Sequence, residues 1–302
     1  MRPRSRWVLW RGSARRRTAT RRSRSGSSCR LPSRPRRAHG PGESGKRPAG
    51  PSGRRGVSMS STGNRTMADH EAYDRAVRER LRRVRERIGA AAARSGRGPD
   101  AVRIVAVTKG HPHGVVEAAL AAGLRDLGEN RVEELARKSP RFEGRGIVWH
   151  MIGHVQSRKA GGAARLAALI HSVDSLRLAG KLSRRGEAEG RRIPVLVQVN
   201  ASGEATKGGF PAADALDGIG TVAELPGLRV DGLMTMAPFT SSEPELRDTF
   251  RRTRLVLEKA AGIDGVEGRE LSMGMSNDFE IAIEEGSTMV RLGTTLFGAR
   301  PA

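Results

Sequence analysis

Cysteine is nearly absent from this 302-residue sequence, which contains only Cys29. One thiol forms no intramolecular disulfide, and residues 67–302 offer no cysteine ligand for a metal site. The sequence also lacks any apolar run of about 18 residues, the length at which a membrane-spanning helix is expected. These absences exclude a disulfide-stapled secreted domain and favour a cytoplasmic location without membrane insertion.

Acidic residues are almost missing from the first 66 residues, where Glu43 stands alone against 19 Lys and Arg. This segment therefore contributes +18 of the formal net charge of +23, and the other 236 residues contribute only +5. Apolar residues are also scarce there, so burial cannot offset the entropy lost on ordering. We predict that residues 1–66 are a disordered Arg-rich tail and that residues 67–302 fold.

Three origins fit this tail. The sequence from Met67 opens like an ordinary N-terminal helix, so residues 1–66 fit a leader translated upstream of a true start at Met67. A transit peptide is the second origin, because the segment is rich in Arg and Ser and poor in acids. A real tail that binds nucleic acid is the third. Only Trp7 and Trp10 would be available for base stacking, so nucleic acid is not the partner we expect.

Short apolar runs alternate with helical stretches in residues 67–302. An opening helix is indicated by apolar residues three or four positions apart, namely Tyr73, Val77, Leu81, Val84 and Ile88. Eight candidate strands follow, at 103–108, 124–128, 147–152, 169–173, 193–199, 229–236, 269–273 and 289–297. Eight strand–helix units predict a single α/β domain, a (β/α)8 TIM-type barrel, for which about 250 residues is typical. An open doubly wound sheet is the alternative, but "TKGHPHG" is not the Gly-rich turn that its first strand requires.

Lys109 ends the first predicted strand, "RIVAVTK". A lysine at the end of a buried strand loses solvation, which is unfavourable unless the amine is paired or used. Desolvation lowers a lysine pKa and leaves a neutral amine that can form Schiff bases with carbonyl compounds, pyridoxal phosphate (PLP) among them. The alternative is a side chain that reaches solvent at the mouth of the barrel.

The ends of the last two predicted strands are typical of a phosphate site. "SMGMSND" leads into a helix whose free N–H groups favour an anion, and the Ser276 hydroxyl can donate as well unless it simply caps that helix. Gly293 allows a close approach of backbone to ligand, with the Thr294 hydroxyl beside it. Arg291 lies two residues earlier and should face the same side as Gly293. If buried, Arg291 needs a partner, either a ligand or a structural acid such as Glu270.

Two further features are less specific. Asn130 follows the second predicted strand in "LGENRVEEL", where it either faces the mouth of the barrel or starts the next helix. Four histidines raise the question of zinc, but no carboxylate accompanies them and Gly153 interrupts the spacing between two of them. We therefore expect no metal site from these four, His111, His113, His150 and His154.

Five stretches together strongly resemble the pyridoxal phosphate homeostasis proteins: "VAVTKGHP", "LGENRVEE", "WHMIGHVQSRK", "GLMTMAP" and "LSMGMSNDFEIAIEEGSTMVRLGTTLFGAR". The resemblance covers about residues 72–300 and implies the alanine-racemase-like barrel of fold type III. It also implies that Lys109 holds PLP as a Schiff base. By the same resemblance, the phosphate contacts fall on Ser276, Gly293 and Thr294, the arginine near the pyridine nitrogen is Arg291, and Asn130 lies near the cofactor. Lys207 matches a second lysine with a minor role.

The resemblance implies a PLP carrier rather than an enzyme. An arginine beside the pyridine nitrogen disfavours its protonation, which weakens PLP as an electron sink. The related racemases also use a tyrosine from a partner's C-terminal β-domain, whereas the only tyrosine here is Tyr73 and the sequence ends soon after the last strand. We expect a monomer that serves vitamin B6 homeostasis and passes PLP to apo-enzymes. A weak PLP-dependent amino-acid racemase, with a histidine such as His150 as second base, is the alternative.

Removal of residues 1–66 provides a test of the predicted domain boundary. A chain that begins at Met67 is expected to unfold at the same denaturant concentration as the full chain and to bind PLP with the same affinity. Chemical denaturation and a PLP titration of both chains measure this. A lower unfolding midpoint for the shorter chain would mean that the tail contains part of the fold.

Overall fold

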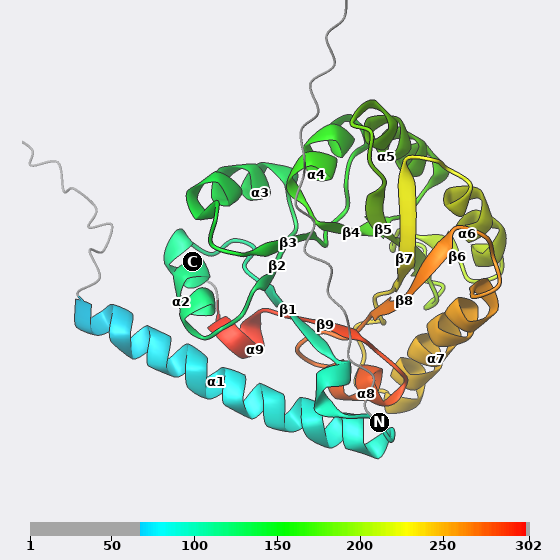
Figure 1. Cartoon of the computed structure of the whole chain (residues 1–302). Coiled ribbons are helices and arrows are strands. Elements are labelled where there is room, and N and C mark those ends of the chain that lie inside the picture. Colours follow the sequence, from blue (N-terminus) through cyan, green and yellow to red (C-terminus); the bar gives the residue numbers. More distant parts are fainter. Residues whose placement is uncertain (1–66, 300–302) are drawn as a thin grey trace, which may run out of the picture. The chain divides into compact units, whose positions relative to one another are not determined.

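The computed structural model describes residues 67–299; the predicted tail and residues 300–302 lie outside this range. Eight parallel strands form a closed barrel (Figure 1). In order around the barrel, they are β1 (Arg103–Val107), β2 (Asp126–Glu129), β3 (Val148–Met151), β4 (Leu169–Val173), β5 (Ile193–Asn200), β7 (Leu228–Met234), β8 (Val266–Ser272) and β9 (Met289–Leu292). Pairing of β9 with β1 closes the ring, and the predicted (β/α)8 barrel is confirmed.

Each barrel strand is followed by a helix that packs outside it (Figure 1). These helices are α2 (His113–Ala121), α3 (Val132–Lys138), α4 (Ala160–Leu166), α5 (Leu176–Ala188), α6 (Ala215–Ala223), α7 (Glu243–Ala260), α8 (Phe279–Glu284) and α9 (Thr294–Phe297). Three short 3₁₀ helices occupy 99–101, 139–142 and 157–159. The two-residue strand β6 (Phe210–Pro211) pairs with β5 outside the ring. It was not predicted, because two residues carry no periodic signal.

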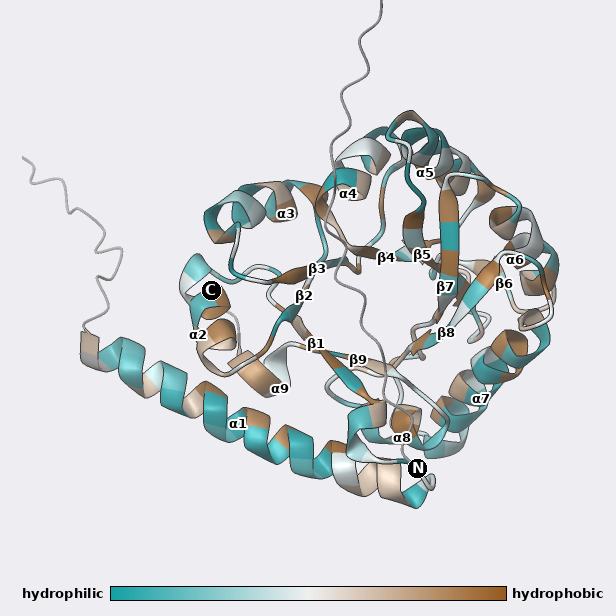
Figure 2. Ribbon diagram, viewed as in Figure 1, coloured by the Kyte–Doolittle hydropathy of each residue, from teal (hydrophilic) through white to brown (hydrophobic). Residues whose placement is uncertain are grey.

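The extra N-terminal helix, α1 (Met67–Arg94), packs against α2, α8 and α9. Its apolar residues form one buried stripe, and its charged residues cover the outward side, which is the teal face of α1 in Figure 2. The hydroxyl of Tyr73 donates to the Phe297 carbonyl at 3.2 Å. The single tyrosine of the sequence thus joins α1 to α9 on the outside of the barrel.

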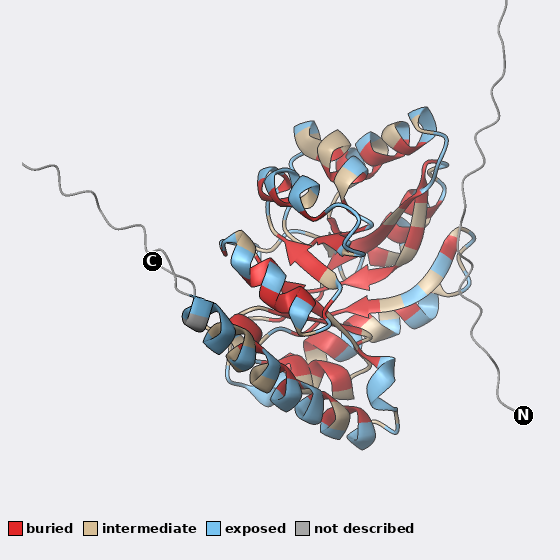
Figure 3. Ribbon diagram, turned by 60° about the vertical axis from the view of Figure 1, so that its left-hand side comes forward, coloured by how far each residue is buried: buried red, intermediate tan, exposed pale blue. Residues whose placement is uncertain are grey.

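Apolar side chains fill both sides of the barrel wall, and Figure 3 shows the strands as the most buried elements. The larger cluster lies between strands and helices. A smaller cluster, to which each of five strands contributes one residue, fills the inside of the barrel; its members are Val105, Leu169, Leu196, Met234 and Met289. Side chains alternate between the two faces of a strand, so every second residue of each strand points into the barrel interior, as these five do.

Four strand predictions differ from the structure by two or more residues at one end. The predicted strand 229–236 ends earlier, at Met234, and the predicted strand 269–273 begins earlier, at Val266. The stretch 289–297 is not one strand, because β9 ends at Leu292 and residues Thr294–Phe297 form the helix α9. The second predicted strand begins at Asp126 rather than 124, since the backbone of Leu124 still hydrogen bonds to the end of α2 through Ala119. Short apolar runs of this kind do not distinguish strand from helix by periodicity. Within residues 67–299 no helix has both the length and the apolarity needed to cross a bilayer.

Candidate functional site

The predicted site residues follow four neighbouring strands, β8, β9, β1 and β2. Lys109 comes two residues after β1, and Asn130 directly after β2. Gly293 and Thr294 come directly after β9, and Ser276 lies in the loop after β8. Parallel strands of a closed barrel have their carboxyl ends at one face, where barrel enzymes bind their ligands. The fold thus brings the amine, the hydroxyls and the glycine to one sector of that face.

Arg291 lies inside the barrel on β9, in register with Val105 of β1. It is only 5% exposed, and its guanidinium donates to the Ser272 carbonyl and hydroxyl, each at 2.7 Å, and to the Thr235 carbonyl at 2.9 Å. Burial lowers the pKa of Arg291 to about 10, although the charge of Asp278 opposes this shift. Arg291 therefore remains a cation at neutral pH and is held by neutral groups.

The alternative in which Glu270 pairs with Arg291 is wrong. The Glu270 carboxylate instead accepts from the Arg103 guanidinium at 3.2 Å and from the Thr288 hydroxyl at 2.6 Å. Because no carboxylate within residues 67–299 hydrogen bonds to Arg291, its positive charge is left available for a ligand.

The loop after β8 reaches the first turn of α9. The Ser276 hydroxyl accepts from the Thr295 N–H at 3.4 Å. Helix α8 is preceded by Asp278, whose carboxylate accepts from the Met275 N–H at 2.5 Å, so Ser276 lies in the loop and is not the residue that caps this helix. Hydroxyl and backbone N–H donors at these two strand ends are the donor set that suits a phosphate ester.

Gly274 determines the path of this loop. Its φ of +93° is rarely accessible to other residues, and a Cβ there would lie 2.7 Å from the Ala282 Cβ and 2.9 Å from the Phe279 Cα. Gly293 differs, because its φ is −116° and an added Cβ would lie 3.4 Å from the nearest atom, the Val107 carbonyl oxygen. Backbone conformation therefore requires glycine at 274 and does not require it at 293.

A buried ion cluster that sequence reasoning missed fixes the turn that carries Lys109. Lys138 is 1% exposed, and its ammonium donates to the Thr108 carbonyl and to Glu129, each at 2.7 Å, and to Glu134 at 2.8 Å. The hydroxyl of Thr108 also donates to Glu129, at 2.6 Å, and the Gly110 N–H donates to Glu134, at 2.7 Å. The backbone on both sides of Lys109 is thereby held.

The two carboxylates of this cluster shift in opposite directions. Burial raises the pKa of Glu129, and the hydrogen bonds from Lys138 and Thr108 only partly offset it. Burial also acts to raise the pKa of Glu134, but the hydrogen bonds from Lys138 and the Gly110 N–H outweigh it and hold this pKa below its usual value. Oε2 of Glu129 is buried without a hydrogen-bond partner. The cluster therefore depends on the lysine for its stability.

Asn130 is positioned by the loop after β3. A Cβ on Gly153 would lie 2.3 Å from the Asn130 carbonyl oxygen, so only glycine allows the two loops to touch. The Ser172 hydroxyl donates to the Gly153 carbonyl at 2.6 Å and fixes that loop to β4. Helix α3 begins at Val132, two residues after Asn130, so Asn130 belongs to the strand end rather than to the helix start.

The four histidines considered for zinc are not brought together. His154 pairs with Asp174 at 2.7 Å, His111 packs edge-on against Phe297, and His150 lies inside the barrel. No group of three or more potential ligands within residues 67–299 is arranged to hold a metal ion. Lys207 donates to the Ala237 carbonyl at 2.7 Å, in the loop after β7, and its charge also acts on Asp278 in the loop after β8.

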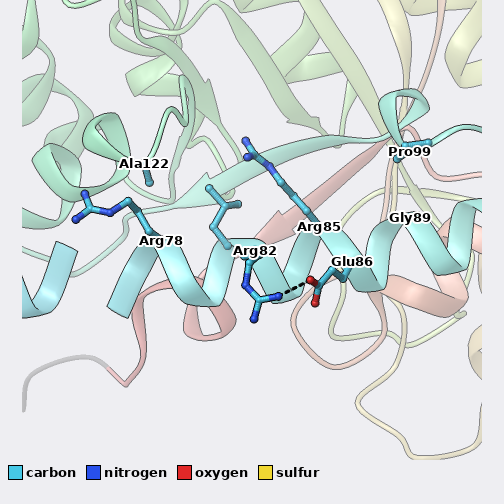
Figure 4. Close-up of a pocket in the computed structure, with 8 residues that line it drawn as sticks. Arg78, Arg82, Arg85, Glu86, Gly89, Pro99 and Ala122 are labelled. Carbon is cyan, nitrogen blue, oxygen red and sulfur yellow. Dashed lines mark hydrogen bonds and ion pairs between the residues drawn. The ribbon is translucent and has the colours of Figure 1, made fainter. Parts of the chain in front are cut away.

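One open groove, with a volume of about 560 Å³, lies outside the barrel along α1 (Figure 4). Arg78, Arg82 and Arg85 line it together with Pro99 and Ala122, and it contains none of the predicted site residues. Arg82 is already paired with Glu79 and Glu86. We therefore place the candidate site at the strand ends and not in this groove.

Comparison with known proteins agrees with the fold. Residues 76–301 match the family model described as alanine racemase, N-terminal domain. A crystal structure of an unknown protein from Bifidobacterium adolescentis is 38% identical and covers 75% of this chain and 96% of its own, with a TM-score of 0.71. PipY of Synechococcus elongatus, solved with PLP bound, is 33% identical and covers 74% of this chain and 100% of its own, with a TM-score of 0.64.

Two curated relatives carry the same name. The pyridoxal phosphate homeostasis protein of Aquifex aeolicus is 39% identical over 222 residues, which are 74% of this chain and 97% of the relative. The Escherichia coli protein of the same name is 39% identical over 232 residues, with the same coverage. Alanine racemase of Clostridium difficile, at 18% identity and a TM-score of 0.57, shares the fold. The chain belongs to the pyridoxal phosphate homeostasis protein family, within the larger group defined by the alanine racemase N-terminal domain.

Proposed function

We propose that this protein binds PLP at the carboxyl ends of β8, β9, β1 and β2 and serves PLP homeostasis as a carrier or regulator. The amine of Lys109 would hold the PLP aldehyde as a reversible Schiff base, with loss of water. Ser276, Gly293 and Thr294 bind the phosphate group, and Asn130 lies beside the cofactor. Bound PLP would supply an aldehyde and an electron-withdrawing ring.

One observation carries the proposal: β1 and β9 are direct neighbours, which supports a site where the amine of Lys109 and the donors after β9 act on one ligand. A phosphorylated aldehyde presents two groups that suit these two sides, namely a carbonyl for the amine and a dianion for the hydroxyl and N–H donors. The relative PipY, whose structure contains PLP, extends this support to the ligand itself.

The environment of Arg291 supports a carrier over a catalyst. A guanidinium that stays charged and faces the pyridine nitrogen opposes protonation of that nitrogen, because two cations would then adjoin. Protonation of the ring is what makes PLP a strong electron sink, so Arg291 restrains carbanion chemistry. The residues present therefore favour storage of PLP over its use in turnover.

The alternative function, a weak amino-acid racemase, needs a second acid–base group opposite Lys109. His150 was the candidate, but both of its ring nitrogens are in hydrogen bonds inside the barrel, to Asp126 at 3.0 Å and to His171 at 2.9 Å. Tyr73 is engaged by Phe297 on the outside of the barrel. These contacts support the carrier role over the racemase. We further propose a monomer in the cytoplasm that passes PLP to apo-enzymes.

Titration of the purified full chain with PLP provides the test. We expect saturation at one PLP per chain, and racemisation of L-alanine by the loaded protein no faster than by free PLP at the same concentration. A turnover number on the order of 1 s⁻¹ or more, as ordinary enzymes show, would contradict the carrier role. Failure to bind PLP at all would contradict the proposal that PLP is the ligand.

A further inference from the structure

Five polar side chains form a continuous line through the barrel interior. From Arg291 on β9, the line passes to the Ser272 hydroxyl at 2.7 Å and from there to Nδ1 of His171 at 2.8 Å. Nε2 of His171 lies 2.9 Å from Nδ1 of His150, and Nε2 of His150 lies 3.0 Å from the Asp126 carboxylate. The contacts join five strands, β9, β8, β4, β3 and β2, across the barrel.

The direction of every hydrogen bond in this line is fixed by its two ends. The Arg291 guanidinium can only donate, so the Ser272 oxygen accepts and its hydrogen is free to point to His171. The Asp126 carboxylate, which also faces the Arg103 guanidinium at 4.0 Å, accepts from His150. Both imidazoles then carry their hydrogen on Nε2 and accept on Nδ1, and each link has one donor and one acceptor.

The surroundings of the line favour a neutral imidazole at His171. His150 is 1% exposed and His171 is fully buried. Burial holds the pKa of His171 well below its usual value, and the neighbouring His150, Arg291 and Arg103 act in the same direction. Apolar residues of the barrel interior, among them Val105, Leu169 and Leu196, exclude water from this region. A protonated His171 would be unfavourable here, because the Arg291 guanidinium is close and no acid within residues 67–299 pairs with His171.

The far end of the line opens at the opposite mouth of the barrel. Asp126 and Arg103 are the first residues of β2 and β1, and both side chains are partly exposed. Arg103 continues to Glu270 at 3.2 Å and borders a cavity of about 310 Å³, which Asp100 and Thr288 also line. Lys109, in contrast, follows the carboxyl end of β1. A route of hydrogen bonds thus links the mouth remote from Lys109 with Arg291.

We propose that Ser272, His171, His150 and Asp126 are positioning residues that hold Arg291 through a one-directional hydrogen-bond chain. The chain fixes the guanidinium from the side away from the cofactor and keeps Ser272 as an acceptor towards it. A substitution at the remote mouth, such as one at Asp126, should therefore change how Arg291 is held, through the two buried imidazoles. The effect on PLP rests on the proposed function, whereas the state of the two imidazoles does not depend on it.

The first test uses the full chain without PLP, labelled with ¹⁵N-histidine. Long-range ¹H–¹⁵N spectra at pH 7, assigned with His150→Gln and His171→Gln, should show both rings as neutral Nε2–H forms. Asp126→Ala should alter the His171 signals, although no hydrogen bond joins the two side chains directly. Asp100→Ala, at the cavity that Arg103 borders, should not alter them. A charged ring, an Nδ1–H form in either ring, or His171 signals that do not change in Asp126→Ala would contradict the proposed hydrogen-bond chain.

The second test measures PLP affinity by equilibrium dialysis. Ser272→Ala removes one acceptor from Arg291 and leaves its two backbone acceptors, so we expect about tenfold weaker binding, the loss typical of one hydrogen bond to a charged group. Ser287→Ala is the matched control, because Ser287 is equally buried and hydrogen bonds only to backbone carbonyls. Equal losses from both variants would contradict the positioning role. If the unsubstituted protein bound no PLP, the proposed function would fail. The histidine spectra would still test the proposed hydrogen-bond chain.

Discussion

Lys109→Ala is expected to lose the visible absorption band of bound PLP completely. On the proposed function, the band would come from a Schiff base with Lys109, which follows a strand that adjoins the donors after β9. Weak binding through the phosphate contacts should remain, because Ser276 and the first turn of α9 are unchanged. Absorption spectra recorded after gel filtration in the presence of PLP measure the loss.

Lys207→Ala is the control for this change. Lys207 is paired with Glu204 and donates to the Ala237 carbonyl, and these partners lie in the loops after β5 and β7. We expect the Lys207→Ala protein to keep its band and its PLP content through gel filtration. A band that survives Lys109→Ala and disappears with Lys207→Ala would mean that the wrong lysine has been assigned.

Lys138→Met is expected to lower the free energy of unfolding by about 3–5 kcal/mol, the effect typical of breaking a buried ion pair on one side. The ammonium of Lys138 is shared by Glu129, Glu134 and the Thr108 carbonyl. Its removal leaves two carboxylates together, one of them fully buried. Equilibrium unfolding in urea at pH 7 measures the change, and PLP affinity should fall as well because the turn carrying Lys109 loses its anchor.

The pH dependence of this loss identifies its cause. Without the lysine, burial and mutual repulsion raise the folded-state pKa of Glu129 and Glu134 above the unfolded value, so the folded state binds protons more readily. The loss caused by Lys138→Met should therefore shrink as the pH falls from 8 to 5. Lys159→Met removes a partly exposed partner of Glu133 and should change little at any pH. A loss independent of pH would indicate that packing, not charge, is responsible.

The barrel could be predicted from the sequence because its signal repeats. Each buried parallel strand reads as a short apolar run, and eight such runs separated by helical stretches leave few arrangements. The errors fall where one local pattern allows two structures, as at 289–297, where Gly293 separates a strand from a four-residue helix. The two-residue strand β6 depends on pairing with β5, which sequence periodicity does not contain.

From the sequence, candidate site residues could be predicted only where they lie at or near the ends of strands. Lys109 and Arg291 stand out because a charged residue in a buried run requires a reason. Lys138 and Glu129 gave no signal in the sequence, since their contact depends on how α3 folds back on β1 and β2. His171 likewise gave no signal, because its partners Ser272 and His150 come from strands distant in sequence. Long-range contacts of this kind are set by the three-dimensional fold.

Reduction of the PLP-loaded full chain with borohydride, followed by peptide mapping, tests the central claim most directly. Hydride converts a Schiff base into a stable secondary amine, so the labelled peptide identifies the lysine that holds PLP. The account predicts one label per chain, on the peptide that contains Lys109. A label found wholly on Lys207, or no label on a chain saturated with PLP, would contradict it.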